Sequence, residues 1–289
     1  FSELIQELNI RELCFESDDV TVATYEQFTQ RLNEASGNVS AVSLTGITGI
    51  TNDLRTIKDD DEMKLLQRAI DIADAAMDAV VPTIEPGITE AEVAWRLEKA
   101  MREMGAESPS FDTIVGSGPN GAIVHYRANS KTNRNIKIND IYLCDSGGQY
   151  HYGTTDVTRT ICFSKQSQRI RNIFTKVLKG HIGVAIYNLK KNTNGKQLDI
   201  IARSALNKAG LDYAHGTGHG VGYFLNVHEG PQAISKINNV RLEEGMILSN
   251  EPGYYESNKF GIRIENLVFI KKYKKKLRFE NLTFAPIEK

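Results

Sequence analysis

Apolar residues recur at steps of three and four in four stretches of the chain, which is the spacing of one face of an amphipathic helix. The first stretch begins at Met63, and Pro82 ends it. The second begins at Thr89, and Glu92 three residues later completes the sequence pattern of a capping box. The predicted helices cover residues 63–80, 89–105, 168–189 and 198–209.

Strand-like runs lie between and after these helices. Two helices followed by a group of strands therefore occur twice along the chain. This order favours an α+β fold with a mostly antiparallel sheet over alternating βαβ units. The predicted strands cover residues 111–115, 141–145, 155–163, 246–251 and 262–270.

The first fifty residues form a separate and shorter α/β pattern. Its expected elements are helices over residues 1–8 and 23–32 and strands over residues 12–16 and 39–44. Asn52, Asp53 and the acidic run at residues 59–62 mark a boundary after it. We therefore expect the end of an N-terminal α/β domain at residues 1–52 and a larger domain at residues 53–289.

The composition is that of a globular protein, with 40% hydrophobic and 25% charged residues among 289. The net charge is -1, so no overall field attracts nucleic acid or anionic lipid. No apolar run reaches the roughly 18–20 residues of a membrane helix. Three cysteines without a C-x-x-C pair suit a reduced, cytoplasmic protein. We expect no nucleic-acid or membrane partner, and, because the chain begins with Phe1, we expect it to be part of a longer one.

The glycine-rich and basic motifs do not match nucleotide-binding or nucleic-acid-binding patterns. Residues 216–222 carry Val221 where G-x-G-x-x-G needs its third glycine, and residues 116–121 lack the Lys-Ser/Thr that ends a P-loop. Gln232 stands where an H-E-x-x-H helix needs its second histidine. The basic run at residues 271–276 fits a solvated strand end or turn.

Four acidic residues and one histidine remain as candidates for a functional site. Each lies at the end of a predicted strand, within a predicted strand or in a turn. Taken singly, an acid beside a glycine turn usually caps that turn. Strand alternation places Arg263 and Glu265 on one face, where buried charges need partners. The spacing alone does not bring the five together, but their chemistry suits a carboxylate-rich centre for Mn(II), Fe(II), Co(II) or Zn(II). They are Asp145, Asp156, His219, Glu251 and Glu265.

Several segments of the larger domain resemble the pita-bread-fold metallopeptidases, and within these most closely the aminopeptidase P (Xaa-Pro aminopeptidase) group. The likeness covers about residues 53–289 and keeps all five positions in family order. It implies a pseudo-twofold antiparallel sheet covered by helices. The segments are residues 110–114, 118–126, 145–150, 153–160, 216–222, 226–231, 250–255 and 261–266.

The resemblance implies a pair of divalent metal ions, with Mn(II) expected first and Zn, Co or Fe as alternatives. Asp145 would bind one ion, His219 and Glu251 the other, and Asp156 and Glu265 both. A hydroxide shared by the metals would attack the carbonyl carbon of an Xaa-Pro bond. Glu251 would carry a proton to the leaving nitrogen, and the first residue of a peptide with proline in second position would be released.

Further residues match the family's substrate site. The resemblance implies that His228 polarises the scissile carbonyl, and that His125 and His215 shape the pocket for proline and the residue after it. Arg263 would support the metal bridge at the same site. The implied catalytic residues are Glu251, His228 and His125.

The remaining histidines and some aromatic residues are assigned separately. His151 and His181 match no functional position of the family. Tyr126, Tyr223 and Phe224 are considered as walls of a proline pocket, although aromatic residues more often belong to a core.

Two other functions stay open at this point. A prolidase would cleave Xaa-Pro dipeptides and would need a positive group for the terminal carboxylate. A pita-bread domain without metal could act as a peptide-binding module, but such a domain is expected to have lost ligand residues. The expected partners are proline-containing peptides, with a homodimer as one expected assembly.

Overall fold

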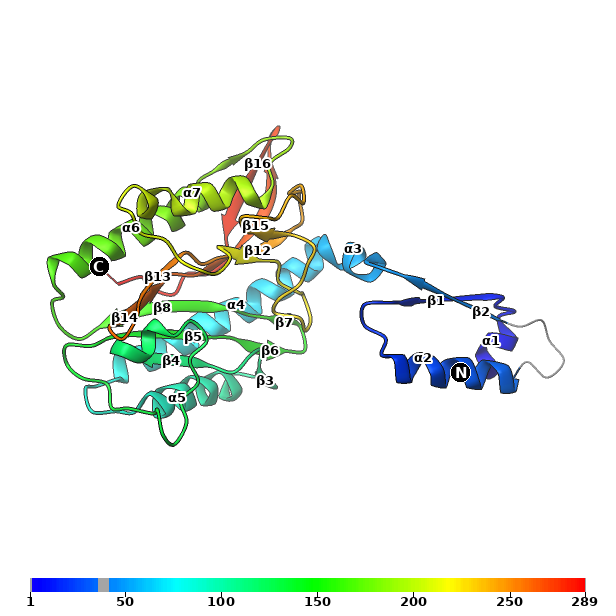
Figure 1. The fold of residues 1–289 in the computed structure, drawn as a ribbon, viewed down its shortest axis with the longest axis horizontal. Coiled ribbons are helices and arrows are strands. Elements are labelled where there is room, and N and C mark those ends of the chain that lie inside the picture. The colour runs from blue at the N-terminus through cyan, green and yellow to red at the C-terminus, as the bar shows by residue number, and fades with distance from the viewer. Residues whose placement is uncertain (1, 36–41, 289) are drawn as a thin grey trace. The chain divides into compact units, whose positions relative to one another are not determined.

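The computed structural model describes residues 2–35 and 42–288. It divides into two compact units, Phe1–Leu54 and Arg55–Lys289 (Figure 1). Each unit has its own secondary structure and is described by itself.

The first unit is a β-α-β arrangement in which β1 and β2 pair in parallel. The rings of Phe15 on β1 and Tyr25 on α2 lie 5.3 Å apart and join the strand to the helix. The strand predicted at residues 39–44 begins outside the described residues. The elements are α1 (Ser2–Glu7), β1 (Glu12–Glu16), α2 (Val22–Ala35) and β2 (Ser43–Ile47).

The four helices predicted for the second unit are present with shifted ends. A capping box starts α4. The Asp59 side chain accepts a hydrogen bond from the backbone N–H of Glu62, and the Glu62 side chain accepts one from the backbone N–H of Asp59. At α5 only half of the predicted box forms, because Thr89 accepts from the Glu92 backbone while the Glu92 carboxylate binds Arg96. The helices are α3 (Ile50–Thr56, across the unit boundary), α4 (Asp60–Val80), η1 (Val81–Thr83), α5 (Glu90–Glu103), η2 (Gly118–Ala122), α6 (Gln168–Ala185) and α7 (Gly195–Asn207).

All strand pairs of the second unit's sheets are antiparallel, which confirms the α+β prediction. The two larger sheets have the strand orders β4-β5-β8 and β12-β15-β16-β9. The strands are β3 (Ser108–Pro109), β4 (Ile114–Ser117), β5 (Ile141–Ser146), β6 (Gly148–Tyr150), β7 (Gly153–Thr154), β8 (Val157–Cys162), β9 (Asn188–Leu189), β10 (Gly218–His219), β11 (Ala233–Ile234), β12 (Ile247–Asn250), β13 (Gly253–Glu256), β14 (Phe260–Arg263), β15 (Asn266–Tyr273) and β16 (Lys276–Asn281).

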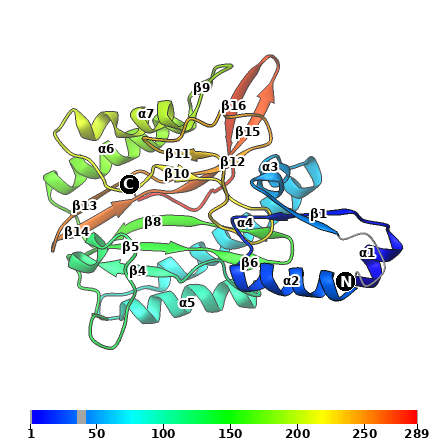
Figure 2. The same ribbon diagram turned by 45° about the vertical axis from the view of Figure 1, so that its right-hand side comes forward.

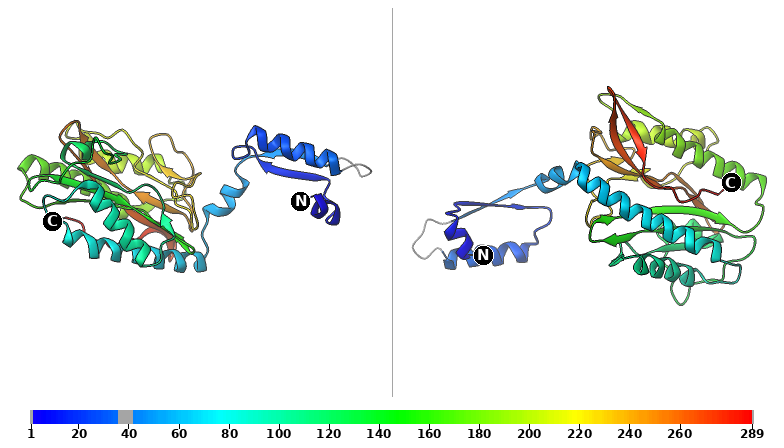
Figure 3. Two further views of the ribbon diagram at one scale, coloured as in Figure 1. Left: turned by 90° about the horizontal axis from the view of Figure 1, so that it is seen from below. Right: turned by 180° about the vertical axis from the view of Figure 1, so that it is seen from behind.

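Each large sheet is covered by one pair of helices, so the second unit has two halves of similar build. In the first half, Met77 of α4 and Leu97 of α5 pack on Val115 and Tyr142 of the strands, and α4 runs across these strands in the right-hand view of Figure 3. In the second half, α6 and α7 lie side by side over β12 and β15 (Figure 2). Contacts of β14 with β5 and β8 join the halves.

The basic run at residues 271–276 forms the exposed hairpin between β15 and β16, as predicted. Within the described ranges, no helix has both the length and the apolar character needed to cross a membrane.

Candidate metal centre

All five predicted ligand residues line one cavity of about 240 Å³ in the second unit. Both halves contribute, because two of the acids come from the first half and the other three residues from the second. The positions are Asp145 within β5, Asp156 between β7 and β8, His219 within β10, Glu251 directly after β12 and Glu265 between β14 and β15.

The first half places its two acids on a rigid, buried framework. Asp145 pairs with Ile114 of β4 on one side and with Thr158 of β8 on the other, so its backbone is fixed from both edges. Asp156 lies just before β8 and is only 5% exposed. Short central strands with buried residues on both faces hold these carboxylates in place.

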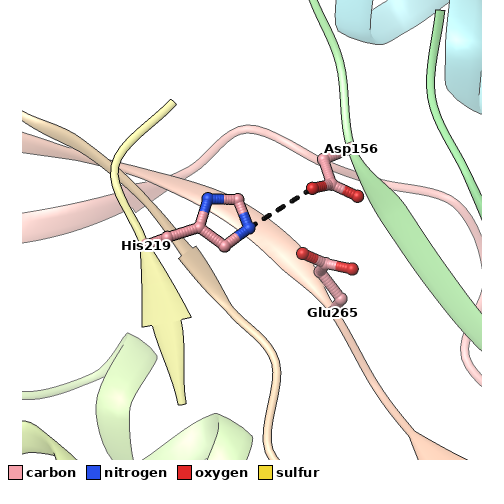
Figure 4. Close-up of side chains that lie close together, drawn as sticks. All are labelled: Asp156, His219 and Glu265. Carbon is pink, nitrogen blue, oxygen red and sulfur yellow. Dashed lines mark ion pairs between the residues drawn. The ribbon is translucent and has the colours of Figure 1, made fainter. Parts of the chain in front are cut away.

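His219 reaches the cavity from the glycine-rich loop that the sequence singled out. A Cβ at Gly218 would overlap the carbonyl oxygen of Ser249, and a Cβ at Gly220 would overlap that of Glu229. The alternating glycines therefore let this short strand lie against β12 while His219 points to the other side. Its Nε2 lies 3.3 Å from Glu251 Oε1. The same nitrogen lies 3.5 Å from Asp156 Oδ2 (Figure 4).

Glu265 lies where the predicted strand 262–270 breaks into β14 and β15, which corrects the expectation of one continuous strand. Its backbone N–H donates to the Thr158 carbonyl over 3.2 Å, and the Thr158 hydroxyl donates to its Oε2 over 2.6 Å. The prediction that Arg263 and Glu265 lie on the same face of the chain is confirmed. Both line the cavity, while Ile262 and Ile264 belong to the core. The break redirects the chain without turning the acid away from the site.

Arg263 is the one Lys or Arg among the described residues that line the cavity. It is 2% exposed, and its Nη2 donates to Asp145 Oδ2 over 2.5 Å. Its Nη1 donates to the hydroxyl of Tyr255 over 2.7 Å, and that hydroxyl is 2.9 Å from His215 Nε2. Sequence reasoning missed Tyr255, because its contacts with His215 and Arg263 form only in the folded chain and nothing local marks the residue.

The four carboxylates of the cavity carry more negative charge than their surroundings compensate. With Arg263 they leave a formal charge of −3 when all are ionised. Burial, and then the neighbouring Asp145 carboxylate, raises the pKa of Asp156 well above its usual value. Burial, and then Asp156, does the same to the pKa of Glu265. Burial also opposes ionisation of Glu251, but His219, His215 and Arg263 outweigh it and lower its pKa.

This donor set fits divalent cations. Ligand atoms of Asp156, His219 and Glu265 all lie within 4.8 Å of one another (Figure 4). Asp145 Oδ1 and Glu265 Oε1 are buried and have no hydrogen-bond partner among the residues that the structure describes, which leaves lone pairs free. Crowded carboxylates with one imidazole are the ligands that Mn(II), Fe(II), Co(II) and Zn(II) accept, and the cations would remove the repulsion.

The three predicted substrate-site histidines line the same cavity. His125 and His228 are exposed, and the His228 ring centroid lies 4.2 Å from that of His219. Partial enclosure of its ring by the cavity walls, and then the nearby His219, lowers the pKa of His228. Burial lowers the pKa of His215. Neutral imidazoles at the cavity can donate a hydrogen bond to a substrate carbonyl.

The three aromatic residues that were considered as pocket walls do not line the cavity. Tyr126, Tyr223 and Phe224 are absent from the cavity lining, and the Tyr126 hydroxyl instead donates to the buried Glu90 over 2.8 Å. In the described lining the one Phe, Tyr or Trp is Phe111, and the sequence marked this residue only by its place in a segment that resembles the family. Of the two unassigned histidines, His151 pairs with Glu107 at the surface.

The chain is similar in sequence to known metallopeptidases. A profile of the metallopeptidase family M24 matches residues 64–272. The probable Xaa-Pro aminopeptidase P of Laccaria bicolor is 48% identical over 214 residues, which are 70% of this chain and 33% of that protein. Across eight curated relatives, the chain spans between 29% and 46% of their length.

Solved structures match nearly the whole chain. An Xaa-Pro dipeptidase from Bacillus anthracis has a TM-score of 0.86 at 32% identity, covering 99% of this chain and 76% of that one. A second match is the X-prolyl aminopeptidase of Caenorhabditis elegans, which is described as a cytosolic enzyme with a di-nuclear active site. Its TM-score is 0.79 at 31% identity, and the match covers 99% of this chain and 48% of that one. By family profile, sequence identity and pita-bread fold, the chain belongs to the metallopeptidase family M24.

Proposed function

We propose that this chain carries the catalytic part of a dinuclear metal-dependent aminopeptidase that releases the first residue from peptides with proline in second position. Residues 53–289 would form the catalytic domain, and residues 1–52 the end of an N-terminal domain. The names of the curated relatives support this activity. A cytosolic location and a homodimer are part of the same proposal, the former supported by the description of the Caenorhabditis elegans enzyme.

One observation carries the proposal. Four carboxylates and His219 meet in one cavity with a single guanidinium, and the same cavity is lined by three further histidines. Asp145 would hold one ion, His219 and Glu251 the other, and Asp156 and Glu265 both. The bound ions, proposed to be Mn(II), would supply Lewis acidity and lower the pKa of water.

The chain's own residues would then bind, orient and move protons. Glu251 Oε1, held by the Ser249 hydroxyl at 2.9 Å, would accept a proton from the attacking water and pass it to the proline nitrogen. His228 would donate to the carbonyl oxygen as negative charge develops there. His125 and His215 would border the proline ring, and Arg263 would hold the Asp145 carboxylate in its orientation.

The second candidate is a prolidase, and the Bacillus anthracis structure carries a name of that kind. A prolidase must hold the terminal carboxylate of a dipeptide. Arg263, the one Lys or Arg of the described lining, is buried and already donates to Asp145, Tyr255 and Thr158. The described residues of the cavity lining thus offer no unengaged guanidinium or ammonium for that carboxylate, which favours longer peptides.

The test compares an Xaa-Pro-Pro tripeptide with an Xaa-Pro dipeptide, each with added Mn(II) and with chelator. Release of the first residue from the tripeptide, abolished by chelator, is the expected result. Cleavage of the dipeptide alone would replace the proposal with the prolidase. No cleavage of either peptide by metal-loaded protein would reject the activity and favour a binding module.

A further inference from the structure

We propose that a buried ion pair between Lys58 and Glu229 positions His228 for its contact with the substrate. The role of His228 itself rests on the proposed function. Lys58 comes just before α4, and Glu229 directly follows His228, so the pair joins two segments 171 residues apart. Neither residue lines the cavity. Both are positioning residues that act through the backbone of the His228 loop.

The pair is fully enclosed. Lys58 Nζ lies 2.6 Å from Glu229 Oε1, and both side chains are 1% exposed. Arg55 adds a second cation, with its Nε donating to Glu229 Oε2 over 2.7 Å and its Nη2 to the Phe224 carbonyl over 2.6 Å. Removing charges from water is costly, so a buried pair is weak evidence of added stability and is better explained by a requirement for one geometry.

The loop has few other restraints near the histidine. Among the described residues, the His228 ring has no hydrogen bond, and its recorded ring contact is with His219. Its place therefore depends on the backbone on either side. On one side Val227 is buried, and on the other the Glu229 N–H donates to the Gly220 carbonyl over 2.8 Å.

The ion pair completes this restraint. The Glu229 backbone is tied to the His219 loop, and its side chain is tied to Lys58, whose own N–H donates to the Gly245 carbonyl over 2.9 Å. Gly245 immediately precedes Met246 and β12, the strand that ends at Asn250, directly before Glu251. Lys58 thus links the His228 loop to the strand that precedes Glu251. In this way it fixes the position of His228 relative to the proposed metal centre.

The test removes the pair without leaving a lone buried charge. The double variant K58M/E229Q keeps both side-chain lengths. K58M alone is not used because the buried Glu229 would keep only the partly exposed Arg55 as a cationic partner. The first readout is the ¹H–¹⁵N imidazole resonance of His228 in the full chain, assigned by its loss in H228A. We expect it to shift or broaden in K58M/E229Q and to stay unchanged in R134M/D140N, which removes a partly buried pair elsewhere.

The second readout is kinetic. On the tripeptide, K58M/E229Q should lower kcat about tenfold with KM changed less than threefold, and should add less than twofold to the loss in H228A. K58R should retain most of kcat. An unchanged His228 resonance, or a loss of kcat that is fully additive with H228A, would overturn the proposal. If the wild-type chain cleaves no peptide, the proposed function fails, and the resonance alone decides this inference.

Discussion

The hydroxyl of Thr158 donates a hydrogen bond to Glu265 across 2.6 Å and joins two parts of the chain 107 residues apart. The same oxygen accepts from Arg263 Nε at 3.2 Å. One buried hydroxyl thus fixes the direction of a carboxylate that is proposed to bind both metal ions. Partners of this kind orient metal ligands, and losing one weakens the site.

Replacing Thr158 with Val should weaken metal binding. Valine keeps the shape of threonine but cannot donate to Glu265, so we expect Mn(II) affinity to fall roughly 10–100-fold, measured by titration calorimetry. T154V is the matched control, since the Thr154 hydroxyl is also buried but donates to Gln149. Equal affinities for wild type and T158V would show that this hydrogen bond does not support the centre.

The glycine-rich loop should tolerate alanine at one position and not at another. A Cβ at Gly220 would overlap the Glu229 carbonyl, whereas one at Gly216 would meet its nearest atom at 3.5 Å. We expect G220A to lose about 1–3 kcal/mol of unfolding free energy and G216A to change by less than about 0.5 kcal/mol. Denaturant unfolding measures both, and similar losses would contradict the packing assigned to this loop.

Stability should fall on acidification because of His181. Burial lowers the pKa of His181 to about 4, and its Nδ1 lies 3.0 Å from the Asn250 carbonyl. Between pH 6.5 and pH 4 the unfolded chain binds this proton and the folded chain does not. The unfolding free energy is therefore highest above pH 6.5 and falls by about 3 kcal/mol as pH drops to 4.

The H181Q variant isolates that effect. Glutamine can still donate to Asn250 but does not titrate, so its stability should depend less on pH over this range. Unfolding would be measured with chelator present, so that protonation of metal ligands is the same in both chains. Parallel curves of unfolding free energy against pH for wild type and H181Q would contradict the assignment.

The sequence predicted the helices well, since their period and their polar first turns are local signals. Asp59 and Glu62 show how sequence neighbours alone can decide a helix start. The half-formed box at Thr89 shows the limit, because Arg96 takes the Glu92 carboxylate one turn later. The strand break before Glu265 was not predictable, because no glycine or proline marks it.

The candidate site was predictable in its members but not in their arrangement. Asp145 and Glu251 stand out at the ends of buried strands, and His219 among alternating glycines. Their grouping came from the family resemblance, since no local rule joins residues so far apart. Tyr255 and Lys58 were missed because each matters through partners that only the folded chain brings near.

The central claim is that five residues form a centre for two divalent ions, and metal content tests it most directly. Purified chain loaded with Mn(II) and passed through a desalting column should retain two ions per chain by elemental analysis. D156A should retain less than one ion, lose peptide cleavage and keep the wild-type circular dichroism spectrum. Two ions retained by a folded D156A with full turnover, or none retained by the wild type, would contradict the account.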